Sequence, residues 1–145
     1  MKLLAKNRRA TYDYALTEKI IAGISLNGDE VKSIKAGHCS LRGSFVFLKN
    51  SEAFLANSQV TPYTHSSSKT YDPLRNRKLL LHRRQINDLV REKLNGNSLV
   101  PVAIILEKNL IKVELGIGKG KKRYDKRQSI KARDTSRELA RNYKF

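Results

Sequence analysis

The segment Leu99–Ile117, LVPVAIILEKNLIKVELGI, decides the fold that we expect for this chain. Two apolar runs, residues 99–106 and 110–117, flank the polar residues 107–109, which is the pattern of a β-hairpin. In the second run, apolar side chains alternate with charged ones at a period of two. That period predicts a strand with one buried side and one solvent-facing side.

The N-terminal part of the chain predicts two further strands and a short helix. TYDYAL, residues 11–16, alternates its tyrosines with other residues in the manner of a half-buried strand. IIAGISL, residues 20–26, is apolar and β-branched enough for another strand. Asn27-Gly28 then predicts a turn. After it, we expect Asp29 to cap a short helix that Gly37 ends in the left-handed conformation.

A second hairpin and a longer helix complete the pattern. Residues 44–48 and 53–56 flank KNSE, and their phenylalanines at 45, 47 and 54 are available to a core. Apolar residues at 86, 89, 90 and 94 predict an amphipathic helix over residues 83–95. Between these elements, residues 59–77 contain two prolines and a triple serine, which are typical of a long loop.

We therefore expect a mainly β fold, a small closed antiparallel barrel of oligonucleotide-binding type with about six strands and two or three short helices. The sequence has neither internal repeats nor βαβ alternation, and its 145 residues fit one domain with an appendage. We assign residues 1–117 to the barrel domain and residues 118–145 to a basic C-terminal tail.

The tail begins in the stretch GIGKGKKRYDKR, residues 116–127. Its glycines at 116, 118 and 120 argue against a stable helix or strand, because glycine loses the most backbone entropy on ordering. Residues 116–145 carry 11 basic and 3 acidic side chains, almost half of the chain's net charge of +17. Few apolar residues follow, so we expect a flexible tail that is disordered when free and helical when bound.

Composition restricts the classes of function. A net charge of +17 indicates a polyanionic partner. Three basic patches with tyrosine or histidine among them favour RNA, because lysine and arginine bind phosphate and tyrosine can stack on a base. A solvated charged surface stays the alternative for any single patch. No apolar run of 18 or more residues is present, so we expect a cytoplasmic protein without a membrane partner.

Catalytic and metal-binding patterns are absent from the sequence. Histidines 38, 65 and 82 lack the spacing of a metal or triad motif, and Cys39 has no second thiol. The glycines and lysines at 116–122 lack the spacing of a phosphate loop. We therefore expect no enzymatic activity, no metal and no cofactor.

Several motifs resemble those of the small protein B family, the SsrA-binding proteins: NRRATYDY, GDEVKSIKAG, FLAN with a following TPY, YDPLRNRKLLLH and GKGKKRYDKR. They occur in family order from about Asn7 to Ile130. The resemblance implies a barrel that holds the transfer-RNA-like part of transfer-messenger RNA. It also implies a tail that occupies the empty messenger channel and decoding site of a stalled ribosome, contacting ribosomal RNA. The implied protein is a non-enzymatic adaptor of trans-translation, and we expect a monomer.

The resemblance also implies which residues bind. The RNA-binding residues are Asn7, Arg8, Arg9, Tyr14, Glu30, Lys32, Lys35, Lys78 and Leu80. The ribosome-binding residues of the tail are Lys119, Lys121, Lys122, Tyr124, Asp125, Lys126 and Arg127. Three positions depart from the family pattern: Ile21 replaces a usual glutamate and removes a polar contact, Lys35 replaces an arginine, and Tyr124 replaces a frequent histidine.

Two other classes of protein fit the same charge. A structural ribosomal protein or an RNA chaperone would share the barrel, but only an adaptor should prefer one structured RNA over an equally charged duplex. A nuclease using scattered histidines and aspartates would instead require a divalent metal and release cleavage products.

Overall fold

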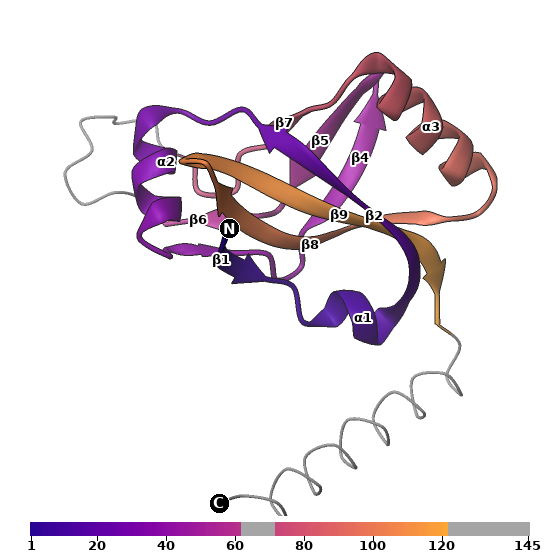
Figure 1. Cartoon of the computed structure of the whole chain (residues 1–145), viewed down its shortest axis with the longest axis horizontal. Coiled ribbons are helices and arrows are strands. Elements are labelled where there is room, and N and C mark those ends of the chain that lie inside the picture. Colours follow the sequence, from indigo (N-terminus) through magenta and orange to yellow (C-terminus); the bar gives the residue numbers. More distant parts are fainter. Residues whose placement is uncertain (62–71, 122–145) are drawn as a thin grey trace, which may run out of the picture.

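Seven strands form one curved antiparallel sheet with helices around it (Figure 1). The computed structural model describes residues 1–61 and 72–121. In chain order, its elements are β1 (Lys2–Lys6), α1 (Arg9–Asp13), β2 (Tyr14–Ile24), α2 (Gly28–Lys35), β3 (Cys39–Ser40), β4 (Phe45–Lys49), β5 (Glu52–Ala56), β6 (Gln59–Val60), β7 (Arg77–Leu80), α3 (Arg83–Leu94), β8 (Ser98–Glu107) and β9 (Leu110–Gly120). The sheet has the order β1-β8-β9-β2-β7-β5-β4, and β3 pairs separately with β6.

Both hairpins expected from the sequence are confirmed. β8 and β9 turn at Lys108 and Asn109, whose φ angles of 49° and 64° suit a two-residue hairpin turn. β4 and β5 turn in the same way at Asn50 and Ser51, with φ angles of 52° and 59°, where the sequence suggested four turn residues. The alternation in β9 buries four apolar side chains of one face, namely Ile111, Val113, Leu115 and Ile117.

One hydrophobic core joins the sheet to α2 and α3. Side chains from six strands of the sheet pack there with Ile34 of α2 and Leu89 of α3. α3 lies where the sequence predicts it, but Val90 is 39% and Leu94 is 81% exposed, so its buried face is narrower than expected. A mainly β fold with three helices is thus confirmed for the described residues.

Closure of the sheet into a barrel stays a prediction. The order of the described strands leaves β1 and β4 as its two edges. β4 lies against β8 but is not its hydrogen-bonded neighbour.

The strand predicted at residues 11–16 is confirmed for residues 14–16 and wrong for residues 11–13. Residues Arg9–Asp13 form α1, and a single strand, β2, runs from Tyr14 to Ile24 and includes most of the second predicted strand. Ala10 gives a physical reason, because it is 1% exposed and packs with side chains of β8. That tertiary contact favours the helix over the local alternation. β1, which pairs with β8, has no counterpart in the sequence-based prediction.

Glycines 116, 118 and 120 do not interrupt β9, contrary to the expectation from sequence. β9 pairs with β2 as far as Gly120. A Cβ atom at Gly118 would lie 2.0 Å from the carbonyl oxygen of Ala15, and one at Gly116 would lie 2.7 Å from Cδ1 of Leu16. These two glycines therefore permit β2 to approach closely. The sheet also extends three residues beyond the boundary that we drew at Ile117.

Phe45, Phe47 and Phe54 lie on the outer side of the β4–β5 hairpin, not in the core that we expected. The side chains that point inward are their neighbours Val46 and Leu55, which are 4% and 0% exposed. Successive residues of a strand point to opposite faces, so the phenylalanines share the other face. The three rings contact one another there, with centres 5.2 Å apart for Phe47 and Phe54 and 6.3 Å apart for Phe45 and Phe47.

Candidate nucleic-acid interface

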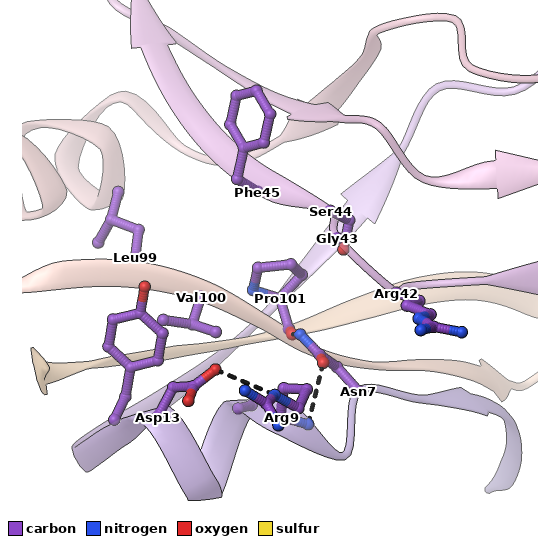
Figure 2. A pocket seen from close by; sticks show the side chains of 12 residues that line it. Asn7, Arg9, Asp13, Arg42, Gly43, Ser44, Phe45, Leu99, Val100 and Pro101 are labelled. Carbon is purple, nitrogen blue, oxygen red and sulfur yellow. Dashed lines mark hydrogen bonds and ion pairs between the residues drawn. The ribbon is translucent and has the colours of Figure 1, made fainter. Parts of the chain in front are cut away.

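Two arginines lie at the surface at the start of α1. Beside them a hollow of about 440 Å³ opens between α1, β8 and the start of β4 (Figure 2). Arg8 and Arg9 are both exposed. Nε of Arg9 lies 3.4 Å from Oδ2 of Asp13, and its guanidinium lies 4.7 Å from the ring centre of Tyr12. The exposed pair places positive charge where a phosphate could approach from solvent.

Asn7 attaches this helix to the sheet. Its backbone N–H donates to the carbonyl of Val102 at 2.7 Å, and its Nδ2 donates to the carbonyl of Pro101 at 2.8 Å. Its Oδ1 accepts a hydrogen bond from the backbone N–H of Arg9 at 3.3 Å. The side chain of Asn7 therefore positions the arginines that follow it.

The beginning of the predicted tail lies beside α1. Tyr14, the first residue of β2, pairs with Gly120. The backbone N–H of Lys121 donates to the carbonyl of Asp13 at 2.8 Å, and the side chain of Lys119 is exposed. Basic residues from distant parts of the sequence thus meet at one end of the sheet.

α2 begins with a capping box. The Oδ1 atom of Asn27 accepts a hydrogen bond from the backbone N–H of Glu30 at 2.9 Å, and the backbone N–H of Asn27 donates to Oε1 of Glu30 at 3.0 Å. Asn27, and not Asp29 as predicted, is therefore the N-terminal cap. Gly37 follows the helix with a φ angle of 83°, which agrees with its predicted role.

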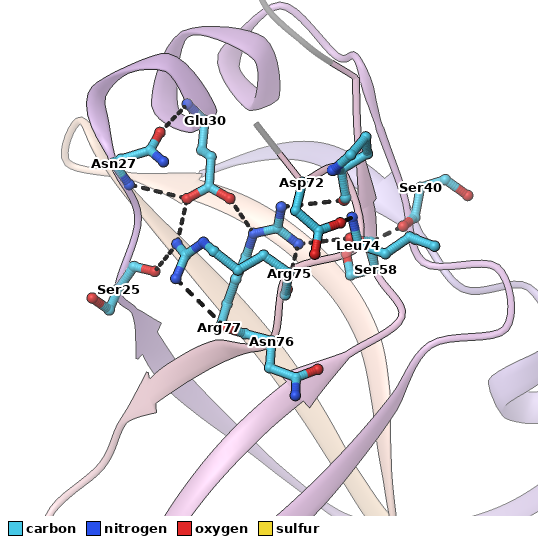
Figure 3. Close-up of polar contacts among 11 residues, drawn as sticks. Ser25, Asn27, Glu30, Ser40, Ser58, Asp72, Leu74, Arg75, Asn76 and Arg77 are labelled. Carbon is cyan, nitrogen blue, oxygen red and sulfur yellow. Dashed lines mark hydrogen bonds and ion pairs between the residues drawn. The ribbon is translucent and has the colours of Figure 1, made fainter. Parts of the chain in front are cut away.

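The carboxylate of Glu30 holds two arginines, Arg75 just before β7 and Arg77 at its start (Figure 3). Nε of Arg77 donates to Oε2 at 2.6 Å, and Nη2 of Arg75 donates to Oε1 at 2.5 Å. Arg77 also donates to the carbonyls of Ser58 at 2.7 Å and Pro73 at 3.3 Å. Glu30 is 1% and Arg77 is 0% exposed, so the network is part of the protein interior.

The electrostatics of this network keep Glu30 ionised. Burial alone would raise its pKa, but hydrogen bonds from Arg75 and from the backbone of Asn27, together with the charge of Arg77, hold the pKa below the ordinary value of 4.5. Both carboxylate oxygens are already engaged. This geometry does not present Glu30 for the direct RNA contact implied by the resemblance, and it makes Glu30 a support of α2.

The other predicted residues are divided between α2 and β7. Lys32 is exposed on α2, and Nζ of Lys35 donates to Oδ1 of Asn109 at 3.0 Å. On β7, Nζ of Lys78 lies 3.2 Å from Oε1 of Glu52, and Leu80 is 54% exposed. Lys78 on β7 therefore has an acidic partner, and Lys35 at the end of α2 has a polar one.

The predicted residues thus form three groups. α1 and α2 lie at opposite ends of β2, and β7 lies alongside β2 (Figure 1). The structure brings the α1 residues together with Tyr14 and Lys119, and it places the α2 residues elsewhere. Five residues predicted for the tail, Lys122, Tyr124, Asp125, Lys126 and Arg127, lie outside the described residues.

Sequence reasoning missed four residues of these sites. Arg42 and Phe45 line the hollow beside α1, and Arg75 and Arg77 form the network with Glu30. The alternation of RKLL offered a signal, because Arg77 shares the buried face of β7 with Leu79. The alternation of FVFLK offered another, since Val46 on the inner face requires Phe45 to face outward.

Features of other site classes are few in the described residues. Within residues 1–61 and 72–121, no group of three or more His, Cys, Asp or Glu side chains is placed to hold a metal. Burial raises the pKa of the Cys39 thiol, although the charge of Arg77 opposes this. None of the helices in these ranges is long and apolar enough to cross a membrane.

Comparisons with known proteins agree on one family. Residues 4–145 match the family model described as SmpB protein. The SsrA-binding protein of Geobacillus sp. (strain WCH70) is 46% identical over 99% of this chain and 93% of its own length. That of Bacillus subtilis (strain 168) is 45% identical over 99% and 92%. A solved structure described as "tmRNA-SmpB: a journey to the center of the bacterial ribosome" has a TM-score of 0.66 and 39% identity, over 86% of this chain and 92% of that one. The chain therefore belongs to the SmpB family of SsrA-binding proteins.

Proposed function

We propose that this protein binds the transfer-RNA-like part of transfer-messenger RNA and delivers it to stalled ribosomes as an adaptor of trans-translation. The observation that carries the proposal is the family match over residues 4–145, with relatives 43% to 46% identical along nearly the whole chain. In this role the protein is non-enzymatic, monomeric and cytoplasmic, and it uses no cofactor.

The α1 end of the sheet is the proposed centre of the RNA contact. Arg8, Arg9 and Tyr14 contact the RNA there, supported by the anchoring of Asn7 to β8. Lys32, Lys35, Lys78 and Leu80 extend the contact along α2 and β7. Glu30 positions α2 through its two arginines.

The sheet and the tail have separate roles in this proposal. The strands of the seven-stranded sheet form a closed barrel of oligonucleotide-binding type, an arrangement supported by the position of β4 against β8. The basic tail, which leaves the sheet after Gly120, occupies the empty messenger channel and the decoding site. Lys119 and Lys121 begin this ribosome-binding segment, and Lys122, Tyr124, Asp125, Lys126 and Arg127 continue it.

Binding and rescue can be tested separately with the full-length chain. The protein should bind the transfer-RNA-like RNA more tightly than a duplex with an equal number of phosphates. Replacing residues 124–127 by alanine lowers the net charge by only one, so this affinity should change little, while tagging of peptides on stalled ribosomes should fail. Equal affinity for the two RNAs would favour an RNA chaperone, and normal tagging would refute the role of the tail.

A further inference from the structure

A half-exposed aromatic ring ends the row of phenylalanines on the β4–β5 hairpin. Phe54 stacks on Phe47, and Phe45 lies against Phe47 at an interplanar angle of 45°. Phe45 is 52% exposed, although Val46 beside it is 4% exposed. Leaving so large an apolar ring in water forgoes hydrophobic stabilisation that a partner covering it would supply.

The turn before β4 fixes the backbone that carries this ring. The backbone N–H and the Oγ hydroxyl of Ser44 both donate to the carbonyl of Leu41, at 3.0 and 2.6 Å. Nδ2 of Asn57 donates to the carbonyl of Gly43 at 3.1 Å. Leu41 is 1% exposed, so the turn is anchored in the core. An anchored backbone and the contact with Phe47 reduce the conformational entropy that the ring loses when it binds.

The surroundings of Phe45 suit a nucleotide. Phe45 lies at the hollow beside α1, whose floor includes Val100 and Pro101 (Figure 2). Arg42 on the turn and Arg9 on α1 also line this hollow, and both are exposed. An unstacked base needs an aromatic face, and its phosphates need cations, so this combination favours RNA over an apolar protein segment. The net charge of +17 points to the same class of partner.

We propose that Phe45 stacks on an unpaired base of the bound RNA and that Arg42 contacts the adjoining phosphate. Phe47 and Phe54 are positioning residues that hold the ring of Phe45. The inference rests on the proposed function and extends its RNA surface from α1 across the hollow to β4.

Five variants of the full-length chain test this inference. F45L keeps an apolar side chain but removes the aromatic face, whereas F45Y keeps the face. R42A removes the cation. L94A and K93A are matched controls on α3, where Leu94 is 81% exposed and Lys93 is also exposed. Dissociation constants are measured against salt concentration, for the transfer-RNA-like RNA and for single-stranded oligouridylate, with thermal unfolding as a check of folding.

Substitutions of Phe45 and of Arg42 should differ in how they change the salt dependence of RNA binding. F45L should weaken binding about tenfold, which is within the range known for base stacking. The slope of log affinity against log salt concentration, the salt slope, should stay unchanged. F45Y should bind like wild type. R42A should lower the salt slope by about 0.7 to 0.9. Both control variants should bind like wild type.

Other outcomes separate the two proposals. A folded F45L variant that binds both RNAs as tightly as wild type overturns the stacking inference. Equal weakening by F45L and F45Y overturns it as well, because the aromatic face would then be irrelevant. Wild-type protein without preference for the transfer-RNA-like RNA defeats the proposed function, and the oligouridylate series then still tests Phe45.

Discussion

The two helices at the ends of β2 use arginine in opposite ways. At α1, Arg8 and Arg9 are exposed, the N-cap residue Arg8 makes no side-chain cap, and the first turn has no acidic residue. At α2, a capping box leads to Glu30, whose carboxylate binds the fully buried Arg77. Arginine is available to a partner at the first end and is part of the fold at the second. A count of basic residues therefore overstates the binding surface.

Replacing Arg77 with methionine should cause the largest loss of stability. The change leaves the carboxylate of Glu30 buried with a weaker set of partners, and breaking a buried pair in this way costs about 3 to 5 kcal/mol of unfolding free energy. Urea unfolding measures the loss. Lys78→Met is the matched control, because Lys78 is 48% exposed and its exposed pairing with Glu52 contributes at most about 1 kcal/mol. Equal losses in the two variants would contradict the contrast drawn between buried and exposed cations.

Gly118→Ala should cause the next largest loss, at the α1 end of the sheet. The added Cβ atom meets the backbone of Ala15, which can move away only by distorting the β2–β9 pairing. Such overpacking costs about 1 to 3 kcal/mol. Gly120→Ala is the control, since a Cβ atom there has no neighbour within 4 Å. Thermal unfolding of both variants makes the comparison, and a stable Gly118→Ala protein would show that this end of the sheet is loosely packed.

Acid should lower the free energy of unfolding through Glu30 in the first turn of α2. Its pKa is lowered in the folded state, so below the ordinary value of 4.5 the unfolded state binds more protons than the native state. The stabilising contribution is therefore complete at neutral pH and is lost as pH falls through the folded pKa. Unfolding free energy measured between about pH 3 and pH 7 should fall more steeply for wild type than for Glu30→Gln. Parallel pH curves for wild type and Glu30→Gln would show that Glu30 does not cause the loss of stability in acid.

Alanine at Arg8 or Arg9 should have the smallest effect on stability. Both side chains are exposed, and the pair of Arg9 with Asp13 is a surface ion pair worth at most about 1 kcal/mol. Each variant should nevertheless lower the salt slope of RNA binding by about 0.7 to 0.9. Lys93→Ala, exposed on α3, is the control of equal charge change. The same slope in all three variants would move the RNA surface away from α1.

Local patterns sufficed to predict much of the fold. Both hairpins and α3 follow from periodicity and turn residues within short segments of sequence. α1 does not, because its helix depends on the contact between Ala10 and β8. The strand conformation of Gly118 likewise depends on how closely β2 approaches it, which no single segment encodes.

The candidate site was harder to predict for a related reason. Arg77 stands in a basic run that looks uniform, and its partner Glu30 lies 47 residues away in the sequence. Phe45 has a side chain typical of a protein core, and only its place in the strand register turns it outward. Residue type suggested the chemistry of these side chains, whereas burial and register decide which of them a partner can reach.

The pairing of Tyr14 with Gly120 fixes the point at which the chain after β9 leaves the sheet. Because β9 is hydrogen-bonded to β2 up to that point, the position from which the tail departs is determined by the sheet and does not depend on tail length. Each residue inserted after Lys121 can then lengthen the reach by at most about 3.6 Å without altering the arginines of α1. An insertion within β9 would instead turn every later side chain to the opposite face. The tail therefore starts from a fixed point beside α1, so that the reach of the tail and the RNA contact at α1 can vary independently.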